Sequence, residues 1–305
     1  MGMPRSGTSA LTRIVSLCGA ALPAAMMGAD SGNARGYWEP RKALRLNHAI
    51  LHRRGSSTYD PSLRLQEDGA FGAAEKEACI AEIAEYLDTL PEAPLVIIKD
   101  LQITALSDMW FEAARLVGFD VAAVIAVRHP QEVAASLGAL MHATPELASA
   151  LWLKYNLLAE RQTRNVPRVF VDYADVLDDW RQEVARISAS IGIDLSTHDG
   201  ELVEEFLTED LRHQRHCGPV QELFGADWMS TVYGALRVAT RDEPLDTSAL
   251  DRVFEAYRAS ELAFRKAFED FHHHSNNMRV RIFRPFIWKL IELIAILKRR
   301  RGTWA

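Results

Sequence analysis

The chain has 305 residues, 48% of them apolar, which is enough to bury the core of one large domain with or without an appendage. The net charge of −6 argues against a nucleic-acid partner. Cys18, Cys79 and Cys217 are odd in number and far apart, so they indicate incidental thiols in a reduced, cytoplasmic protein. The run His272–His274 lacks acidic or cysteine partners at ligand spacing, so we expect no metal site.

The first informative segment is the loop Gly2–Ser9, which has the spacing of a Walker-type phosphate loop. Thr8 stands where a nucleotide triphosphatase has its lysine, and Ser9 stands where the magnesium-binding hydroxyl would be. The positive charge lies inside the loop instead, at Arg5. The two glycines allow the backbone to wrap an anion, and the amides that open the following helix would bind it. The loop therefore predicts phosphate binding without the apparatus for hydrolysing ATP or GTP.

Only Met1–Met3 precede this loop, whereas a phosphate loop normally follows a buried strand of about 5 to 6 residues. Either the first strand is a stub or the chain begins after the true start of the gene. Loss of a central strand would leave backbone groups unpaired, so we expect a truncated start.

The remaining elements follow from hydrophobic periodicity and from the positions of glycine and proline. Short apolar runs predict buried parallel strands over 95–99, 121–127 and 168–171. Helical spacing predicts helices over 8–17, 41–53, 73–90, 105–117, 131–140, 145–163 and 176–191. Strands that alternate with helices indicate an α/β fold of three layers with a central parallel sheet and right-handed crossovers.

Cationic residues follow the predicted strands at the point where each strand ends. Arg5, Lys99 and Arg128 all fall at carboxyl ends, which is where parallel sheets bind ligands. Arg128 is followed by Ser136 two turns into the next helix, and a guanidinium with a hydroxyl makes a compact site for a dianion. The sequence thus predicts two anion sites on neighbouring strands, which a ligand with two separated phosphate groups would satisfy.

These motifs resemble those of sulfotransferases that use 3'-phosphoadenosine 5'-phosphosulfate (PAPS), in particular the bacterial carbohydrate-type members. The segment Pro4–Ser9 is similar to the family's P-loop-like 5'-phosphosulfate loop, and Arg128 with Ser136 is similar to its 3'-phosphate pair. The segment Asp172–Leu177 resembles the family's Tyr-Glu-Asp-Leu stretch, and Leu211–His213 resembles a leucine-arginine-histidine stretch near the cofactor. The resemblance covers roughly residues 1 to 240. It implies PAPS binding, with 3'-phosphoadenosine 5'-phosphate as product and no metal, by Arg5, Ser6, Gly7, Thr8, Ser9, Arg128, Ser136 and Arg212.

The chain departs from the family pattern at Lys99–Gln102, where a Lys-Asp-Pro-Arg segment is common. The missing arginine at position 102 puts a cofactor or acceptor contact there in doubt. Lys99 itself has two interpretations: it stabilises the bridging oxygen, or it pairs with Asp100 or Asp120.

Sulfuryl transfer requires a general base to accept the proton of the acceptor hydroxyl. We favour Glu39, which lies in the aromatic turn Gly36–Pro40, and the resemblance implies a glutamate base in this region. The alternative is that Glu39 caps helix 41–53, since proline follows it. His48 and His52, one turn apart on that helix, are substitutes for the base.

The C-terminal segment 279–301 holds eight Lys or Arg residues and one acid around an apolar run. That run is too short to span a bilayer, because a spanning helix needs about 20 apolar residues. We expect a sulfotransferase domain over 1–275 and a basic amphipathic helix or tail over 279–305. That helix either lies on an anionic membrane face, through 283–301, or packs on protein.

The sequence therefore predicts a cytoplasmic PAPS-dependent sulfotransferase that acts on a hydroxyl of a carbohydrate, glycolipid or other small acceptor. Two alternatives stay open at this point. One is a small-molecule kinase with a phosphate loop, against which the absent lysine counts, and the other is a nucleotide-binding module without catalysis.

Overall fold

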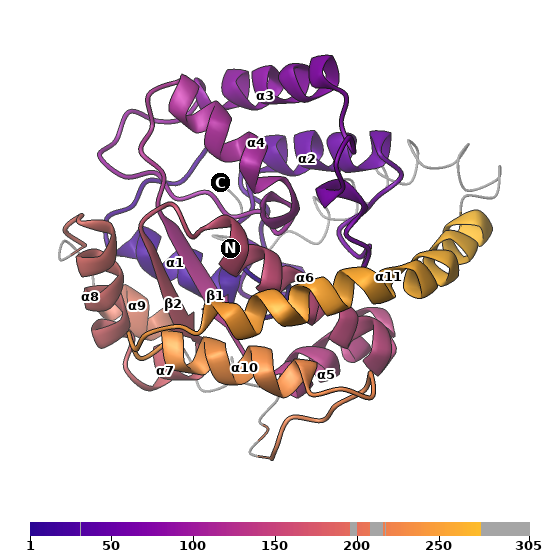
Figure 1. Ribbon diagram of the computed structural model, residues 1–305. Helices are drawn as coiled ribbons and strands as arrows, with labels where there is room; N and C mark the ends of the chain where they lie inside the picture. The colour runs from indigo at the N-terminus through magenta and orange to yellow at the C-terminus, as the bar shows by residue number, and fades with distance from the viewer. Residues whose placement is uncertain (31, 196–199, 208–215, 217, 276–305) are drawn as a thin grey trace.

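The computed structural model describes residues 1–30, 32–195, 200–207, 216 and 218–275. These residues form a helix-rich α/β fold around a two-stranded parallel sheet, which Figure 1 shows enclosed by helices. The strands are β1 (Ala123–Val127) and β2 (Arg168–Asp172), paired from Ala123 opposite Arg168 to Val127 opposite Asp172. Both strands end at the same edge of the sheet, so the residues that follow them are neighbours.

Helices lie before, between and after the two strands along the described chain. Their bounds are α1 (Thr8–Leu17), α2 (Arg41–Arg53), the short 3-10 helix η1 (Arg64–Gln66), α3 (Ala73–Leu87), α4 (Ile103–Leu116), α5 (Pro130–Met141), α6 (Pro145–Gln162), α7 (Tyr173–Asp178), α8 (Trp180–Ile191), α9 (Gly200–Phe206), α10 (Trp228–Ala239) and α11 (Thr247–Ser275).

The strands carry apolar side chains on both faces, since successive residues of a strand point to opposite sides. Ile125 and Phe170 pack into a buried cluster with α6, α10 and α11. Ala126 and Val171 pack into a second cluster with α1 and α8. A third cluster joins α2, α3 and α4, which lie together at the top of Figure 1. The strand pair is thus covered by helices on both faces, which leaves its ends as the place where polar side chains can gather.

The helices predicted over 8–17 and 41–53 are confirmed in full, and each is preceded by a residue in a non-helical conformation. Gly7 precedes α1 with a φ of 87°, and Pro40 precedes α2 with a φ of −66°. The predicted helix 73–90 ends earlier, at Leu87. The predicted helix 176–191 is wrong as one element: Asp179, at φ −148°, accepts a hydrogen bond from the Gln182 amide and thereby starts α8 as a separate helix.

The predicted strand 95–99 is also wrong. This segment forms a single parallel bridge, between Ala21 and Val96, and its backbone bonds go to that one short neighbour. Met1–Met3 likewise run beside β1 through one bridge, between Gly2 and Ala126, in which the Ala126 amide donates to the Met1 carbonyl at 3.0 Å. Both segments lie parallel to their neighbours but are too briefly paired to count as strands.

Several predictions fall outside the described residues. These are the roles of Arg212 and of the leucine-arginine-histidine stretch, the thiol Cys217, and the basic segment 279–305. Within the described ranges, no helix combines the length and apolar character that crossing a membrane requires.

Candidate active site

The loop before α1 has a backbone that only certain residues tolerate. Arg5 has a φ of 69° and Gly7 a φ of 87°, both in the left-handed region. A Cβ atom on Gly7 would lie 2.1 Å from the ring of Tyr173, so glycine is required there for space as well as for conformation. The loop is thereby pressed against the residue that follows β2.

The N-terminus of α1 offers its amides without a competing side chain. The helix has no side-chain cap and no acid in its first turn. Ser6 is fully buried, and among the described residues its hydroxyl has no hydrogen-bond partner. Uncapped amides at a helix start carry partial positive charge and bind anions. An anion that reached this point would complete hydrogen bonds that the loop leaves unmade.

The side chain of Arg5 reaches across to α5. Its Nε donates to the hydroxyl of Ser136 at 3.0 Å, and its Nη1 donates to the carbonyl of Gly32 at 3.3 Å. The two predicted anion sites are therefore adjacent, since Arg5 belongs to one and Ser136 to the other.

Arg128, which directly follows β1, interlocks with the same loop. Its Nη1 donates to the Arg5 carbonyl at 3.0 Å, and its Nε donates to Glu132 at 2.8 Å. The guanidinium carbon lies 4.8 Å from the centre of the Tyr173 ring, which is a cation–π contact. The indole of Trp152 donates to the Arg128 carbonyl at 3.1 Å and so fixes the backbone behind it. Both arginines thus lie on one side of the molecule, at the carboxyl ends of the strands.

A second cluster of charge joins the same loop through Lys99. Its ammonium donates to Glu39 at 2.6 Å, to the Tyr37 carbonyl at 3.1 Å and to the Ser9 hydroxyl at 3.3 Å. Lys99 and Glu39 are both buried. Since Ser9 lies in the first turn of α1, this ion pair stands directly beside the predicted phosphate loop.

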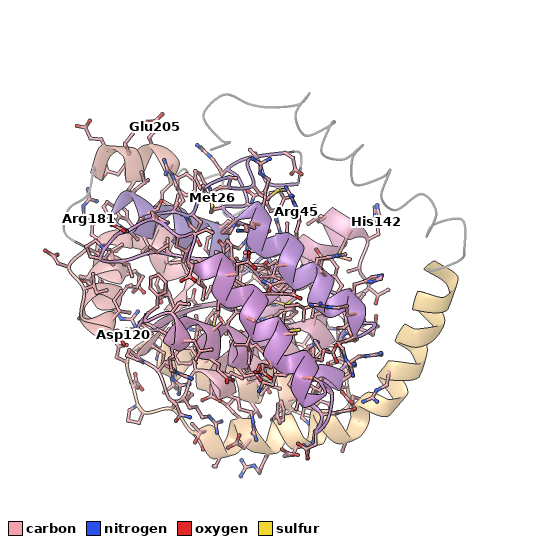
Figure 2. All side chains as sticks on the ribbon, turned by 90° about the horizontal axis from the view of Figure 1, so that it is seen from above. Met26, Arg45, Asp120, His142, Arg181 and Glu205 are labelled. Carbon is pink, nitrogen blue, oxygen red and sulfur yellow. The ribbon has the colours of Figure 1, made fainter. Side chains whose placement is uncertain are left out.

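These contacts decide two of the alternatives that the sequence left open. Lys99 pairs with Glu39 rather than with Asp100 or Asp120, and Asp120 is exposed at the edge of the molecule (Figure 2). Glu39 does not cap helix 41–53, because α2 has Pro40 at its N-cap and no side-chain cap bond. His48 and His52 stack on each other at 6.4 Å between ring centres, and His52 is exposed.

Asp100, which the sequence offered only as a possible partner of Lys99, lies behind the Lys99–Glu39 pair. Its carboxylate is buried and accepts hydrogen bonds from the Gln102 amide at 2.8 Å and from Asn47 at 3.0 Å. Burial, together with the nearby charge of Glu39, raises the pKa of Asp100 to about 7. Asn47 in turn accepts from the indole of Trp110 at 2.8 Å, so α2 and α4 are tied to the site. The sequence signal that could have marked Asp100 is its position as a polar residue directly after a buried apolar run.

Tyr59 is the other residue that sequence reasoning missed. Burial raises the pKa of its hydroxyl, Glu39 raises it further and Arg5 lowers it, so the hydroxyl lies within electrostatic range of both. The neighbouring Thr58 is held by Gln102, whose amide donates to the Thr58 hydroxyl at 2.8 Å. Gln102 therefore fixes this segment. Tyr59 lies outside any periodic element, so no pattern marked it.

A cavity of about 170 Å³ opens beside Arg128, at the carboxyl ends of β1 and β2. The ring of His129 lies 4.6 Å from that of His216, and burial lowers the pKa of His129. Among the described residues, no group of three or more His, Cys, Asp or Glu side chains is placed to hold a metal ion. The cavity is lined by Arg128, His129, Glu132, Asp172, Ala174, Asp175, His216, Tyr233 and Arg237.

No protein-family model matches the sequence, and no curated protein is similar to it. Among solved structures, the chain is similar to the sulfotransferase domain of the Synechococcus PCC 7002 olefin synthase. The identity is 17% and the TM-score 0.46, and the match covers 77% of this chain and 92% of that one.

Proposed function

We propose that this chain is a PAPS-dependent sulfotransferase that transfers a sulfuryl group to a hydroxyl of a carbohydrate or glycolipid acceptor. The observation that carries the proposal is the interlock of two predicted anion sites. Arg128 holds the Arg5 carbonyl while the Arg5 side chain holds Ser136. A ligand with phosphate groups at two ends could contact the start of α1 and the Arg128–Ser136 pair at once.

The residues present fit such a ligand. The uncapped start of α1 and the unpartnered Ser6 hydroxyl would receive the 5'-phosphosulfate end. Gly7, where a Cβ atom would meet the Tyr173 ring, allows the backbone of this loop to lie close to Tyr173. Arg128 and Ser136 would receive the 3'-phosphate, since guanidinium and hydroxyl groups match its oxygens. We also infer the three-layer, P-loop-like arrangement of this family for the domain.

PAPS would supply the sulfuryl group: the acceptor oxygen forms a bond to sulfur while the bond from sulfur to the 5'-phosphate breaks. Glu39 would take the proton that the acceptor hydroxyl loses. Lys99, held between Glu39 and Ser9, places a positive charge beside the loop that binds the departing phosphate. Such fixed charges are effective because they need no reorganisation during the reaction.

A small-molecule kinase is less well supported. Ser9 stands where a kinase of this loop type would bind magnesium, but here its hydroxyl accepts from the Lys99 ammonium and donates to the Tyr37 carbonyl. A metal cation at that position would be repelled by the ammonium. The kinase alternative therefore requires Lys99 to leave this position.

Two experiments test the proposal. Calorimetric titration should show tight binding of 3'-phosphoadenosine 5'-phosphate and weak binding of ATP with magnesium, and the reverse order would favour the kinase. Glu39→Gln should abolish transfer from PAPS while the affinity for 3'-phosphoadenosine 5'-phosphate is kept, since the loop is not altered. A nucleotide sensor would bind equally well and show no transfer in the wild-type protein.

The acceptor class and the membrane contact stay predictions. A glycolipid acceptor would agree with peripheral binding of the basic segment 283–301 to an anionic membrane, but that segment lies outside the described residues.

A further inference from the structure

Glu132 is buried beside Arg128, within the candidate site, and the sequence assigned it no role. Only 2% of its surface is exposed. One carboxylate oxygen accepts from Nε of Arg128 at 2.8 Å, and the other accepts from the backbone amide of His216 at 3.0 Å. A carboxylate next to a guanidinium that binds phosphate lowers the net charge of the site, so its presence there calls for a physical reason.

The geometry of Arg128 supplies that reason. A guanidinium is a planar fork, and it binds phosphate well only when its plane and edge face the anion. Here Glu132 holds one edge at Nε, the Arg5 carbonyl holds Nη1 at 3.0 Å, and the Tyr173 ring lies 4.8 Å below the guanidinium carbon. The three contacts together fix the position and the tilt of the fork.

Glu132 is well placed for this task because it is itself rigid. It lies in the first turn of α5, four residues after Arg128, and its carboxylate is 2.8 Å from Nε of the guanidinium. The preceding His129 starts that helix by accepting a hydrogen bond from the Gln131 amide at 3.3 Å. A carboxylate on a capped first turn loses little freedom when it binds, so it orients its partner efficiently.

We propose that Glu132 is a positioning residue that orients Arg128 toward a 3'-phosphate and locks that arginine to the phosphate loop. This inference rests on the proposed function and deepens it, because it names how the site distinguishes 3'-phosphorylated nucleotides from those without the group. Glu132 contacts Arg128 and not the ligand, so its effect appears in nucleotide discrimination rather than in the chemistry of transfer.

The test is calorimetric titration of two probes, 3'-phosphoadenosine 5'-phosphate and adenosine 5'-phosphate, into the full chain. The ratio of their affinities measures how strongly the 3'-phosphate is recognised. In Glu132→Ala this ratio should fall by roughly tenfold or more, the value of one charge-assisted hydrogen bond. In Glu132→Gln it should fall less, because the amide oxygen can still accept from Nε of Arg128.

Glu160→Ala provides the matched control. Glu160 is also buried and also pairs with an arginine four residues away, Arg164, at 2.7 Å. It additionally contacts Arg168, which begins β2 and so lies at the opposite end of the strand from the candidate site. This variant should lose stability without any change in the ratio of affinities.

Each outcome decides the matter. A ratio in Glu132→Ala that equals or exceeds the wild-type ratio would overturn the positioning role. A loss in Glu132→Gln as large as in Glu132→Ala would overturn it too, since the amide oxygen can still accept from Nε of Arg128, while the charge and the bond from the His216 amide are lost. If Glu132→Ala fails to fold, the Gln variant decides alone. A ratio of affinities between unity and the wild-type value supports the positioning role, and a ratio equal to the wild-type value overturns it. Wild-type protein that binds both probes equally would instead contradict the proposed function, and the role of Glu132 would fall with it.

Discussion

Two buried glutamates pair with arginines four residues away, and they stand at opposite ends of the same sheet. At the amino end of β2, Glu160 binds Arg164 and Arg168, and Arg164 also binds Asp251. At the carboxyl end of β1, Glu132 binds Arg128, whose guanidinium also contacts a backbone carbonyl and an aromatic ring. In the cluster at the amino end, each arginine is paired with a carboxylate, and these ion pairs connect α6 to β2 and α11.

The difference lies in what else the guanidinium touches. At the amino end the Arg164 guanidinium contacts the carboxylates of Glu160 and Asp251, which makes a structural clamp. At the carboxyl end the guanidinium supports a loop with left-handed residues at Arg5 and Gly7. Strained backbone persists only where the surroundings hold it, and it concentrates at functional sites. The same ion pair thus serves stability at one end and, in our account, ligand recognition at the other.

After Glu39→Gln, the largest effect is expected from Lys99→Met. The change removes the charge beside the loop and leaves Glu39 buried without its 2.6 Å partner. Turnover with PAPS should fall on the order of 10²- to 10³-fold, which is typical of a lost electrostatic contact in a catalytic site. Initial rates of sulfate transfer measure it.

The control for that variant is Lys76→Met, which removes a partly exposed lysine that pairs with Asp108 on α4. Its rate should match the wild type. Equal rates for Lys99→Met and wild type would remove Lys99 from the mechanism.

Gly7→Ala tests the phosphate loop. The added methyl group would meet the Tyr173 ring and would sit at a φ of 87°, which disfavours any residue with a Cβ. We expect affinity for 3'-phosphoadenosine 5'-phosphate to weaken roughly tenfold or more, as 1 to 3 kcal/mol of strain implies. Gly118→Ala, also at positive φ but in open space, is the comparison; nucleotide affinity should be unchanged there, and a loss in both variants would refute the steric argument.

Glu160→Ala should lower the free energy of unfolding by about 2 kcal/mol, because Arg164 keeps Asp251 as a partner while Arg168 loses its carboxylate. Chemical denaturation measures this. A change in nucleotide affinity together with the loss of stability would show that the two ends of the sheet are not independent.

The last prediction concerns the pH dependence of stability. The pKa of Asp100 is raised to about 7 by burial, so between about pH 4 and 7 the folded state holds a proton that the unfolded state has lost. Stability should therefore fall as pH rises through this window. Asp100→Asn should flatten the profile, and an identical slope in that variant would assign the titration to another group.

Local signals predicted much of this fold. The helices over 8–17 and 41–53 follow from Gly7 and Pro40, and the apolar runs after Asp120 and Pro167 do contain the strands. The strand predicted over 95–99 was wrong because an apolar run indicates burial, whereas a strand also requires a neighbouring strand to pair with. The break at Asp179 was visible in principle, since aspartate is a common helix cap.

The candidate site was predictable only in part. Arg5, Arg128 and Ser136 come together as strand ends require, and that placement follows from topology. The ion pair between Lys99 and Glu39 joins residues 60 positions apart in the sequence. It depends on the conformation of the loops between them, which no local sequence pattern predicts. Glu132 could have been found, because an acid four residues after an arginine at a helix start is a recognised pair.

The most direct measurement is an experimental structure of the chain with 3'-phosphoadenosine 5'-phosphate bound. Our account predicts the 5'-phosphate against the amides at the start of α1 and the 3'-phosphate on Arg128 and Ser136 in one molecule. A nucleotide that contacts only one of these positions, or binds elsewhere, would contradict it.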